Sequence, residues 1–253
     1  MENPISYPLL VFVASLILLW IAARIGAAVR KKRPQMDEEA YHDLVVVLGA
    51  TLTLLGLIIG FTFSMAVTRY DLRKQREAEE ANAIGTEYLR ASLLPAADAA
   101  RTRALLQHFL DQRIRYYETP VWRQLEPGSA EATQLQREMW SAVLSPATAQ
   151  PTPLSALVVS GMNDVLNAKD YTEAAWRNRI PSAAWIFVLG IAVFCNLVVG
   201  YVAHGKSSIS YVVLPIALAI SLFLLSDIDS PRGGVIRVHP HNLQSLADSL
   251  RSQ

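Results

Sequence analysis

A row of small, uncharged side chains lies in an apolar stretch of the sequence. Residues of this kind in such a place can line a path for ions or allow two helices to pack closely. Its members recur at spacings of four, three, four and four: Gly49, Thr53, Gly56, Gly60 and Ser64. This spacing places them on one face of a helix. Gly56 and Gly60 form the Gly-x-x-x-Gly pattern that lets helix backbones approach closely in lipid. A face without bulk or charge could also frame a pore in a ring of subunits, so both interpretations stay open.

Two further groups of polar residues suit contacts between helices. Asn196 lies in another apolar stretch, where an amide commonly links two helices, although it can also mark a substrate path. Asn82, Gly85 and Thr86 form a small polar surface on a charged helical segment. We predict that this surface is an interface with another helix, in a homo-oligomer.

Charged residues and histidines follow the last apolar stretch. Asp227, Asp229 and Arg232 would lie at the mouth of the membrane, where carboxylates could bind a cation. His239 and His241 could join a metal site. The favoured interpretation is a capped helix end with an Asp229–Arg232 pair and a flexible tail, so no metal site is predicted.

The sequence offers no catalytic residues and no cofactor site. It lacks the His-Glu-x-x-His, Gly-x-Ser-x-Gly, phosphate-loop and dinucleotide-binding patterns. A formal net charge of +1 gives no reason to expect nucleic-acid binding. The middle of each apolar stretch contains no Asp, Glu, Lys or Arg, which argues against a proton pump or a voltage sensor. We therefore do not expect an enzyme.

Four windows are long and apolar enough to cross a bilayer as helices: 7–29, 44–67, 180–203 and 209–226. Hydrophobic residues form 52% of the chain, too few for a protein that lies wholly in lipid. A polar helical insert accounts for the remainder. We predict an all-α integral membrane protein. Its parts would be a first hairpin, the insert with its stalk helices, a second hairpin and a short tail, at 1–67, 68–179, 180–226 and 227–253.

The second window continues without proline into a charged segment, so one helix is expected to run from Leu44 to Leu94 as a stalk. Arg73–Glu77 and Arg76–Glu80 are spaced i, i+4, which favours a solvated helix face.

Turn and cap residues divide the rest of the insert. Ser129 follows a Pro-Gly turn as a candidate N-cap, residues 145–153 resemble a linker, and Thr152 precedes a proline that suits the first helical position. Pro181 predicts a kink or a short break before the third window, and residues 233–238 a brief extended segment.

Three runs resemble the bacterial bestrophin-like domain family of unknown function. They are Gly60-Phe-Thr-Phe-Ser64, Glu79-Glu-Ala-Asn-Ala-Ile-Gly-Thr86 and Asp227-Ile-Asp229-Ser-Pro-Arg-Gly-Gly234, and the likeness extends over nearly the whole chain. The resemblance implies a multi-pass protein of the bacterial inner membrane. It also implies a distant likeness to bestrophins, which are pentameric anion channels regulated by calcium. The acidic run of the bestrophin calcium clasp is not recognisable here.

Two functional hypotheses follow. The first is an oligomeric, anion-permeable channel in the lipid bilayer, with the small-residue face lining or framing the pore. The second is a non-conducting membrane scaffold or envelope sensor that binds a partner or ligand through the insert. The basic run 30–33 favours a cytoplasmic first hairpin loop and an extracytoplasmic insert, although basic residues also flank the insert.

Overall fold

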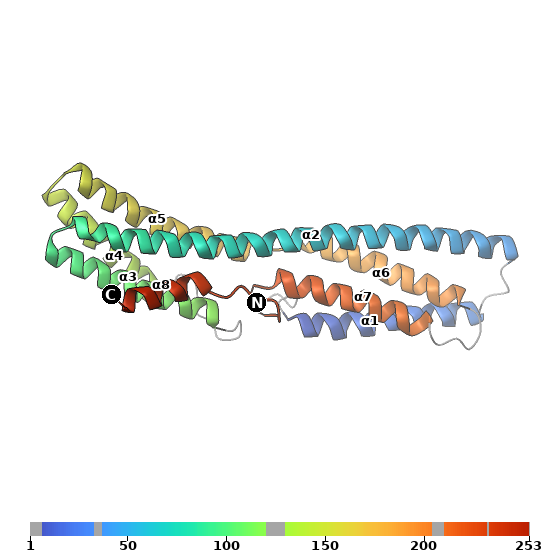
Figure 1. The fold of residues 1–253 in the computed structure, drawn as a ribbon. Coiled ribbons are helices and arrows are strands. Elements are labelled where there is room, and N and C mark those ends of the chain that lie inside the picture. The colour runs from blue at the N-terminus through green and yellow to red at the C-terminus, as the bar shows by residue number, and fades with distance from the viewer. Residues whose placement is uncertain (1–6, 33–36, 120–129, 204–209, 232, 253) are drawn as a thin grey trace. The chain divides into compact units, whose positions relative to one another are not determined.

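The computed structural model describes residues 7–32, 37–119, 130–203, 210–231 and 233–252. Within these residues the protein is all-α and contains no strand (Figure 1). This confirms the fold class expected from the sequence.

Four helical segments of the described chain are long and apolar enough to cross a membrane. They are α1 (Pro8–Lys32), the first part of α2 (Glu38–Arg90), α6 (Ser182–Val202) and α7 (Ser210–Asp229). The four spans predicted from hydropathy are thus confirmed.

The second span and the stalk form one uninterrupted helix. Helix α2 contains 53 residues, which corresponds to roughly 80 Å at 1.5 Å per residue. A short turn of 3-10 helix, η2 (Ala91–Leu93), follows it. Leu94 then adopts an extended conformation, with ψ of 161°. The cause is Pro95, because a proline pushes the residue before it out of the helical region.

Three helices make up the rest of the insert: α3 (Ala96–Glu118), α4 (Ala130–Ala149) and α5 (Pro153–Arg177). The predicted cap at Thr152 is confirmed. Its Oγ1 accepts from the Ser155 N–H at 3.0 Å, and Ser155 Oγ accepts from the Thr152 N–H at 2.9 Å. Because two otherwise unpaired donors are satisfied reciprocally, α5 has a firmly defined start.

The expected linker at 145–153 is mostly helix. Helix α4 continues through Pro146 to Ala149. Proline has no backbone N–H, so the helix loses one hydrogen bond at Pro146. The loss has little effect because Pro146 lies in the last turn of the helix. The Pro146 carbonyl still accepts from the Gln150 N–H at 3.0 Å. The candidate cap Ser129 and the preceding turn lie outside the described residues.

The break predicted at Pro181 is present. Helix α5 ends at Arg177, Asn178 is extended with ψ of 102°, and α6 begins one residue after Pro181. The stalk helix before the third span is therefore separated from that span by a short break. Helix α5 is a separate element, because proline cannot continue the backbone hydrogen bonding of the helix before it.

The segment after the fourth span differs from expectation in two respects. Residues 233–236 form a turn and bends, and residues 237–238, which follow, are irregular, so the described segment contains no strand. The tail expected to be flexible contains helix α8 (His241–Arg251). Its buried residues, Leu243, Ala247 and Leu250, recur at helical spacing, so α8 packs one apolar face.

The chain separates into two compact units, of which unit 1 comprises Met1–Arg69 and Arg179–Arg237. In this unit α1 packs closely against α6. A Cβ atom at Gly26 would overlap the Leu197 carbonyl, and one at Gly200 would overlap the Ala23 carbonyl. Only glycine fits at both positions, as is typical of tightly packed membrane helices.

Unit 2 comprises Tyr70–Asn178 and Val238–Gln253. Its apolar core draws on the second part of α2 and on α3, α4, α5 and α8. Fully or nearly fully buried members include Ile84, Leu106, Phe109, Met139, Val143, Met162, Val165 and Leu243. Helices α3 and α4 together supply several of these residues.

Candidate functional site

The small-residue face of α2 is open to its surroundings within unit 1. All five of its members are exposed: Gly49, Thr53, Gly56, Gly60 and Ser64. A Cβ atom at any of the three glycines would meet nothing within 4 Å. Leu55 and Ala66, on another side of the same helix, are buried. The chain therefore packs one side of this span and leaves the small-residue face uncovered.

Polar groups of this face form hydrogen bonds within the helix. Thr53 Oγ1 donates to the Gly49 carbonyl at 3.0 Å, and the backbone carbonyl of Ser64 accepts from Thr68 Oγ1 at 2.9 Å. The face thus presents uncharged, mildly polar oxygen atoms between glycines. Such a surface can pack against another helix or line a wet passage.

Asn196 does not share this face. Its side chain is 0% exposed inside unit 1. The Nδ2 group donates to the Ala192 carbonyl of the same helix at 2.8 Å, while Oδ1 has no hydrogen-bond partner among the described residues. In the described chain this amide makes no link to another helix.

The predicted interface residues of α2 divide into two groups. Asn82 and Thr86 are exposed and available to another helix. Gly85 instead faces α8 of its own chain, because a Cβ atom there would lie 3.1 Å from Leu246 Cδ1. The small size of Gly85 therefore serves packing inside unit 2.

Asp227 binds the backbone of the turn that follows α7. Its side chain is buried, and its two oxygens accept from the Val235 and Ile236 N–H groups, both at 2.8 Å. A Cβ atom at Gly234 would overlap the same carboxylate. The acid and the glycine of the Asp-x-Asp-Ser-Pro-Arg-Gly-Gly run thus form one structural unit.

Asp229 has a similar role at the start of the third span. Its carboxylate accepts from the Ile180 N–H at 3.1 and 3.3 Å, and it is buried. Arg232, its expected partner, lies outside the described residues. The carboxylates of Asp227 and Asp229 therefore hold backbone N–H groups of the segments that follow α7 and precede α6.

The histidines of the tail lie side by side, with ring centroids 5.6 Å apart. Among the residues with defined positions, no group of three or more His, Cys, Asp or Glu could hold a metal ion.

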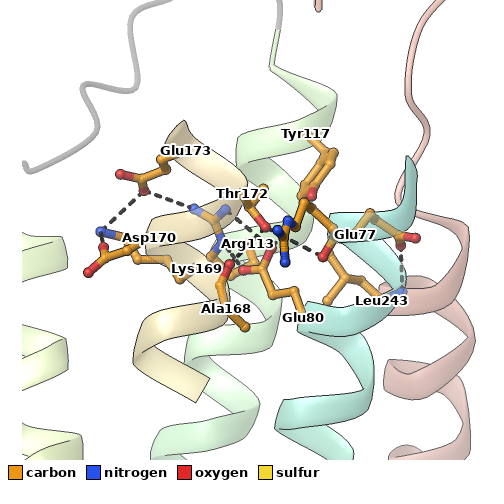
Figure 2. Close-up of polar contacts among 11 residues, drawn as sticks. Glu77, Glu80, Arg113, Tyr117, Ala168, Lys169, Asp170, Thr172, Glu173 and Leu243 are labelled. Atoms are coloured by element: carbon orange, nitrogen blue, oxygen red, sulfur yellow. Dashed lines mark hydrogen bonds and ion pairs between the residues drawn. The ribbon is translucent and has the colours of Figure 1, made fainter. Parts of the chain in front are cut away.

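Unit 2 contains a buried charge cluster, defined here as Glu80, Arg113, Lys169 and Glu173 (Figure 2). Arg113 Nε of α3 donates to Glu80 of α2, and Arg113 Nη1 lies 3.3 Å from Glu173 Oε1 of α5. Lys169 Nζ lies 3.2 Å from the same Glu173 oxygen. The cluster joins three helices with nearly balanced charge.

The Arg113 side chain is only 4% exposed. Burial by itself would lower the pKa of its guanidinium, but the adjacent Glu80 carboxylate holds that pKa above its usual value. The guanidinium also lies 4.6 Å from the centroid of the Tyr116 ring. Burial, followed by the Glu80 charge, raises the pKa of Tyr117, whose hydroxyl lies 3.5 Å from Glu80 Oε2.

Two other charged residues of α2 cap neighbouring helices. Arg73 is fully buried and donates to the Ala175 and Asn178 carbonyls at the end of α5, at 3.3 and 3.1 Å. Glu77 accepts from the Asn242 and Leu243 N–H groups at the start of α8, at 2.9 and 3.0 Å. Each charge opposes the dipole of the helix end that it binds.

The solvated face expected on the stalk is therefore wrong for Arg73, Glu77 and Glu80, which are all buried. A signal was available, because Arg73, Glu77, Glu80, Ile84 and Glu87 recur at spacings of four, three, four and three. That is the spacing of a packed helix stripe. The charges along it concealed the pattern.

Glu87 ends this stripe and differs from the other members. Its side chain is 0% exposed, and neither carboxylate oxygen has a hydrogen-bond partner among the described residues. A Cβ atom at Gly161 of α5 would overlap the carboxylate. Burial raises the pKa of Glu87 to about 8; nearby Arg90 lowers it in part, and Asp164 raises it further.

A family model and solved structures were each found to be similar to this chain, and both concern bestrophin-like proteins. The model of the bestrophin-like domain matches residues 10–243. Among the curated proteins, no sequence matches the chain.

Solved structures share the fold. A single-residue variant of a bacterial bestrophin homologue from Klebsiella pneumoniae superposes with a TM-score of 0.67 at 13% identity, covering 95% of this chain and 94% of that one. Another crystal structure of a bacterial bestrophin homologue from Klebsiella pneumoniae gives 0.63 at 14% identity, over 94% and 95%. At such low identity the likeness speaks for the fold alone. Because the domain model matches nearly the whole chain, this membrane protein belongs to the bestrophin-like family.

Proposed function

We propose that this protein is an oligomeric membrane channel for small anions, with the small-residue face of α2 lining or framing the pore. The observation that carries the proposal is the exposure of all five face residues, together with the open space above Gly49, Gly56 and Gly60. Lipid chains gain little from contact with glycine and hydroxyl groups. Neighbouring subunits or water are better partners for this surface.

The proposal requires a homo-oligomer, because one uncovered helix face cannot enclose a passage. The exposed Asn82 and Thr86 of the stalk are further candidates for contact between subunits. Anions are proposed because the family is named for bestrophins, which conduct anions. The uncharged face is compatible with an anion and holds no acidic side chain that would repel one.

The test combines mass and flux. The molar mass of the purified protein in mild detergent is determined by light scattering corrected for bound detergent. Chloride and sodium fluxes are then measured in liposomes that contain the protein. We expect one species of several subunits and a chloride flux that exceeds the sodium flux. A persistent monomer would reject the channel and favour a scaffold or sensor, and a larger sodium flux would reject the anion assignment.

A matched pair of variants tests the pore face itself. Gly60→Leu places bulk on the face, whereas Gly190→Leu places the same bulk at an exposed glycine of α6 with open space around it. We expect G60L to lower flux at least about tenfold with an unchanged assembly mass, because it narrows the passage. The G190L protein should conduct normally. Normal flux through G60L, or equal losses in both, would remove the pore assignment.

We also propose a location in the bacterial inner membrane with the insert outside the cytoplasm, supported by the basic run 30–33. Leu89 is exposed on the insert and suits a cysteine label, while the native Cys195 is buried. A Leu89→Cys protein should react with a membrane-impermeant maleimide in spheroplasts. Labelling only after the membrane is opened would reverse the orientation.

A further inference from the structure

The carboxyl group of Glu87 occupies an unusual position, because it lies between α2 and α5 without a hydrogen bond to either helix. It projects from α2 onto the backbone of α5 at Gly161, where the absence of a side chain leaves room for it. Both oxygens are shielded from solvent and have no hydrogen-bond partner among the described residues. An ionised carboxylate in such a place has lost its water and gained no hydrogen bond in return.

The charged groups around Glu87 compensate for that loss only in part. Arg90, one turn further along α2, has its Nη1 beside the same point of Gly161 as the Glu87 carboxylate and lowers the pKa of Glu87 to some extent. It makes no ion pair with Glu87 among the described residues, and its Nη1 lies 3.9 Å from Asp164 Oδ2. Asp164 is itself an acid and disfavours a second negative charge. Arg103 of α3 is directed elsewhere, because its Nε donates to the Tyr88 carbonyl at 3.3 Å and its guanidinium lies over the Tyr88 ring.

We propose that Glu87 is a proton switch in the insert: it is neutral while α2 and α5 are packed together, and loss of its proton separates them. Burial of the neutral acid against Gly161 costs far less than burial of the anion. The anion requires water, which can enter only when α5 moves away from α2. The switch is independent of ion conduction, since it concerns packing within unit 2.

The direction of the pH dependence follows from linkage. The pKa of Glu87 is about 8 in the packed state, against an ordinary value of 4.5 once the group is solvated. The packed state therefore holds its proton more tightly, and packing weakens as the pH rises from about 4.5 toward about 8. In this interval the equilibrium constant for opening increases by about tenfold per pH unit, and it becomes constant above it.

Hydrogen exchange on the full-length protein in detergent measures this opening. Protection factors of α5 amides near Gly161, corrected for the intrinsic pH dependence of exchange, are compared at about pH 6, 7 and 8. In the wild-type protein they should fall by about tenfold per pH unit. In Glu87→Gln, whose amide cannot ionise, they should not change with pH. Glu79→Gln is the control and should behave as wild type, because Glu79 is an acid of the same helix whose side chain is 41% exposed.

Equal pH dependence in wild type and E87Q would overturn the switch. An infrared measurement on the wild-type protein tests the protonation state of Glu87 directly, even if the E87Q protein does not fold. Wild-type difference spectra between about pH 7 and pH 9 should lose the C=O band of a protonated carboxyl group, because a carboxyl with a pKa near 8 ionises in this range. Spectra without such a band would show that Glu87 is already ionised at pH 7, and would reject the proposal.

Discussion

At the scale of single residues, Glu87 and Gly161 occupy one space from opposite helices. The carboxylate of one lies where a Cβ atom of the other would be. Their identities are therefore coupled, although they are far apart in the sequence. Such coupling can be measured by changing both residues together and comparing the result with the two single changes.

We predict that Gly161→Ala destabilises unit 2 by about 1–3 kcal/mol, because its methyl group has to displace the buried carboxyl. The same change in a Glu87→Ala background should cost much less, since only the end of the Arg90 side chain then lies near the added methyl group. Urea or thermal unfolding of the four proteins measures the coupling. Additive effects would mean that the two side chains do not meet.

The Asp227 carboxylate offers a second test at this scale. We predict that Asp227→Asn lowers the free energy of unfolding by about 1–3 kcal/mol, because an amide turns an N–H group toward one of the two backbone donors. Asp248→Asn, at an exposed side chain of α8, is the control and should change little. An unchanged melting temperature in D227N would show that the turn is held by other contacts.

At the scale of elements, three other helices of unit 2 attach to α2 through its charged side chains. Arg73 holds the end of α5, Glu77 holds the start of α8, and Glu80 holds Arg113 of α3. One stripe of charges thus docks three helices. In most packed helices this is done by apolar side chains.

We predict that Arg113→Met costs about 3–5 kcal/mol of stability, because it leaves the Glu80 carboxylate buried without its cation. The exposed Arg115 lies two positions along the same helix, so Arg115→Met is a matched control that should be nearly neutral. Thermal unfolding in detergent compares the two. A similar loss in both variants would assign the effect to α3 helicity rather than to the charge cluster.

Sequence patterns predicted the positions of the helices far better than they predicted the contacts between helices. Hydropathy found the four spans, and the Thr152-Pro153 pair found the start of α5, because both signals are local. Glu77 and Glu80 could not be placed in the same way. Their partners, Leu243 and Arg113, lie far along the chain, and a charged residue on a helix is indistinguishable from a solvated one until its partner is known.

The candidate site shows the same limit. The spacing from Gly49 to Ser64 predicted one helix face, and that face is exposed. Gly85 was grouped with Asn82 and Thr86 by size and polarity, yet it packs against Leu246 of its own chain. Glu87 was not singled out, because its distinguishing property is the absence of a partner, which only tertiary structure defines.

At the scale of the whole molecule, each unit is assembled from chain segments that are distant in sequence. Unit 2 is completed by residues from Val238 onward, after both spans of the second hairpin. Helix α8 contributes Leu243, Ala247 and Leu250 to the core of the insert. The insert is therefore not a self-contained segment between the second and third spans.

We predict that deletion of residues 238–253 opens the insert while the spans still enter the membrane. The deletion removes apolar contacts and leaves Glu77 without the N–H groups it binds. Limited proteolysis of membranes should then cut between α3 and α5 much faster than in the wild type. Deletion of residues 252–253 alone is the control. Equal resistance of both truncated proteins would mean that α8 is dispensable for unit 2.

Because Glu77 binds the start of α8, folding of unit 2 can be completed only after α8 has been synthesised. The ribosome delivers α2, the insert and the second hairpin before α8, so the core of unit 2 stays unfinished until α8 has been synthesised. We expect a nascent chain interrupted before α8 to carry an open insert. Proteases can then distinguish incomplete copies of the chain from finished ones.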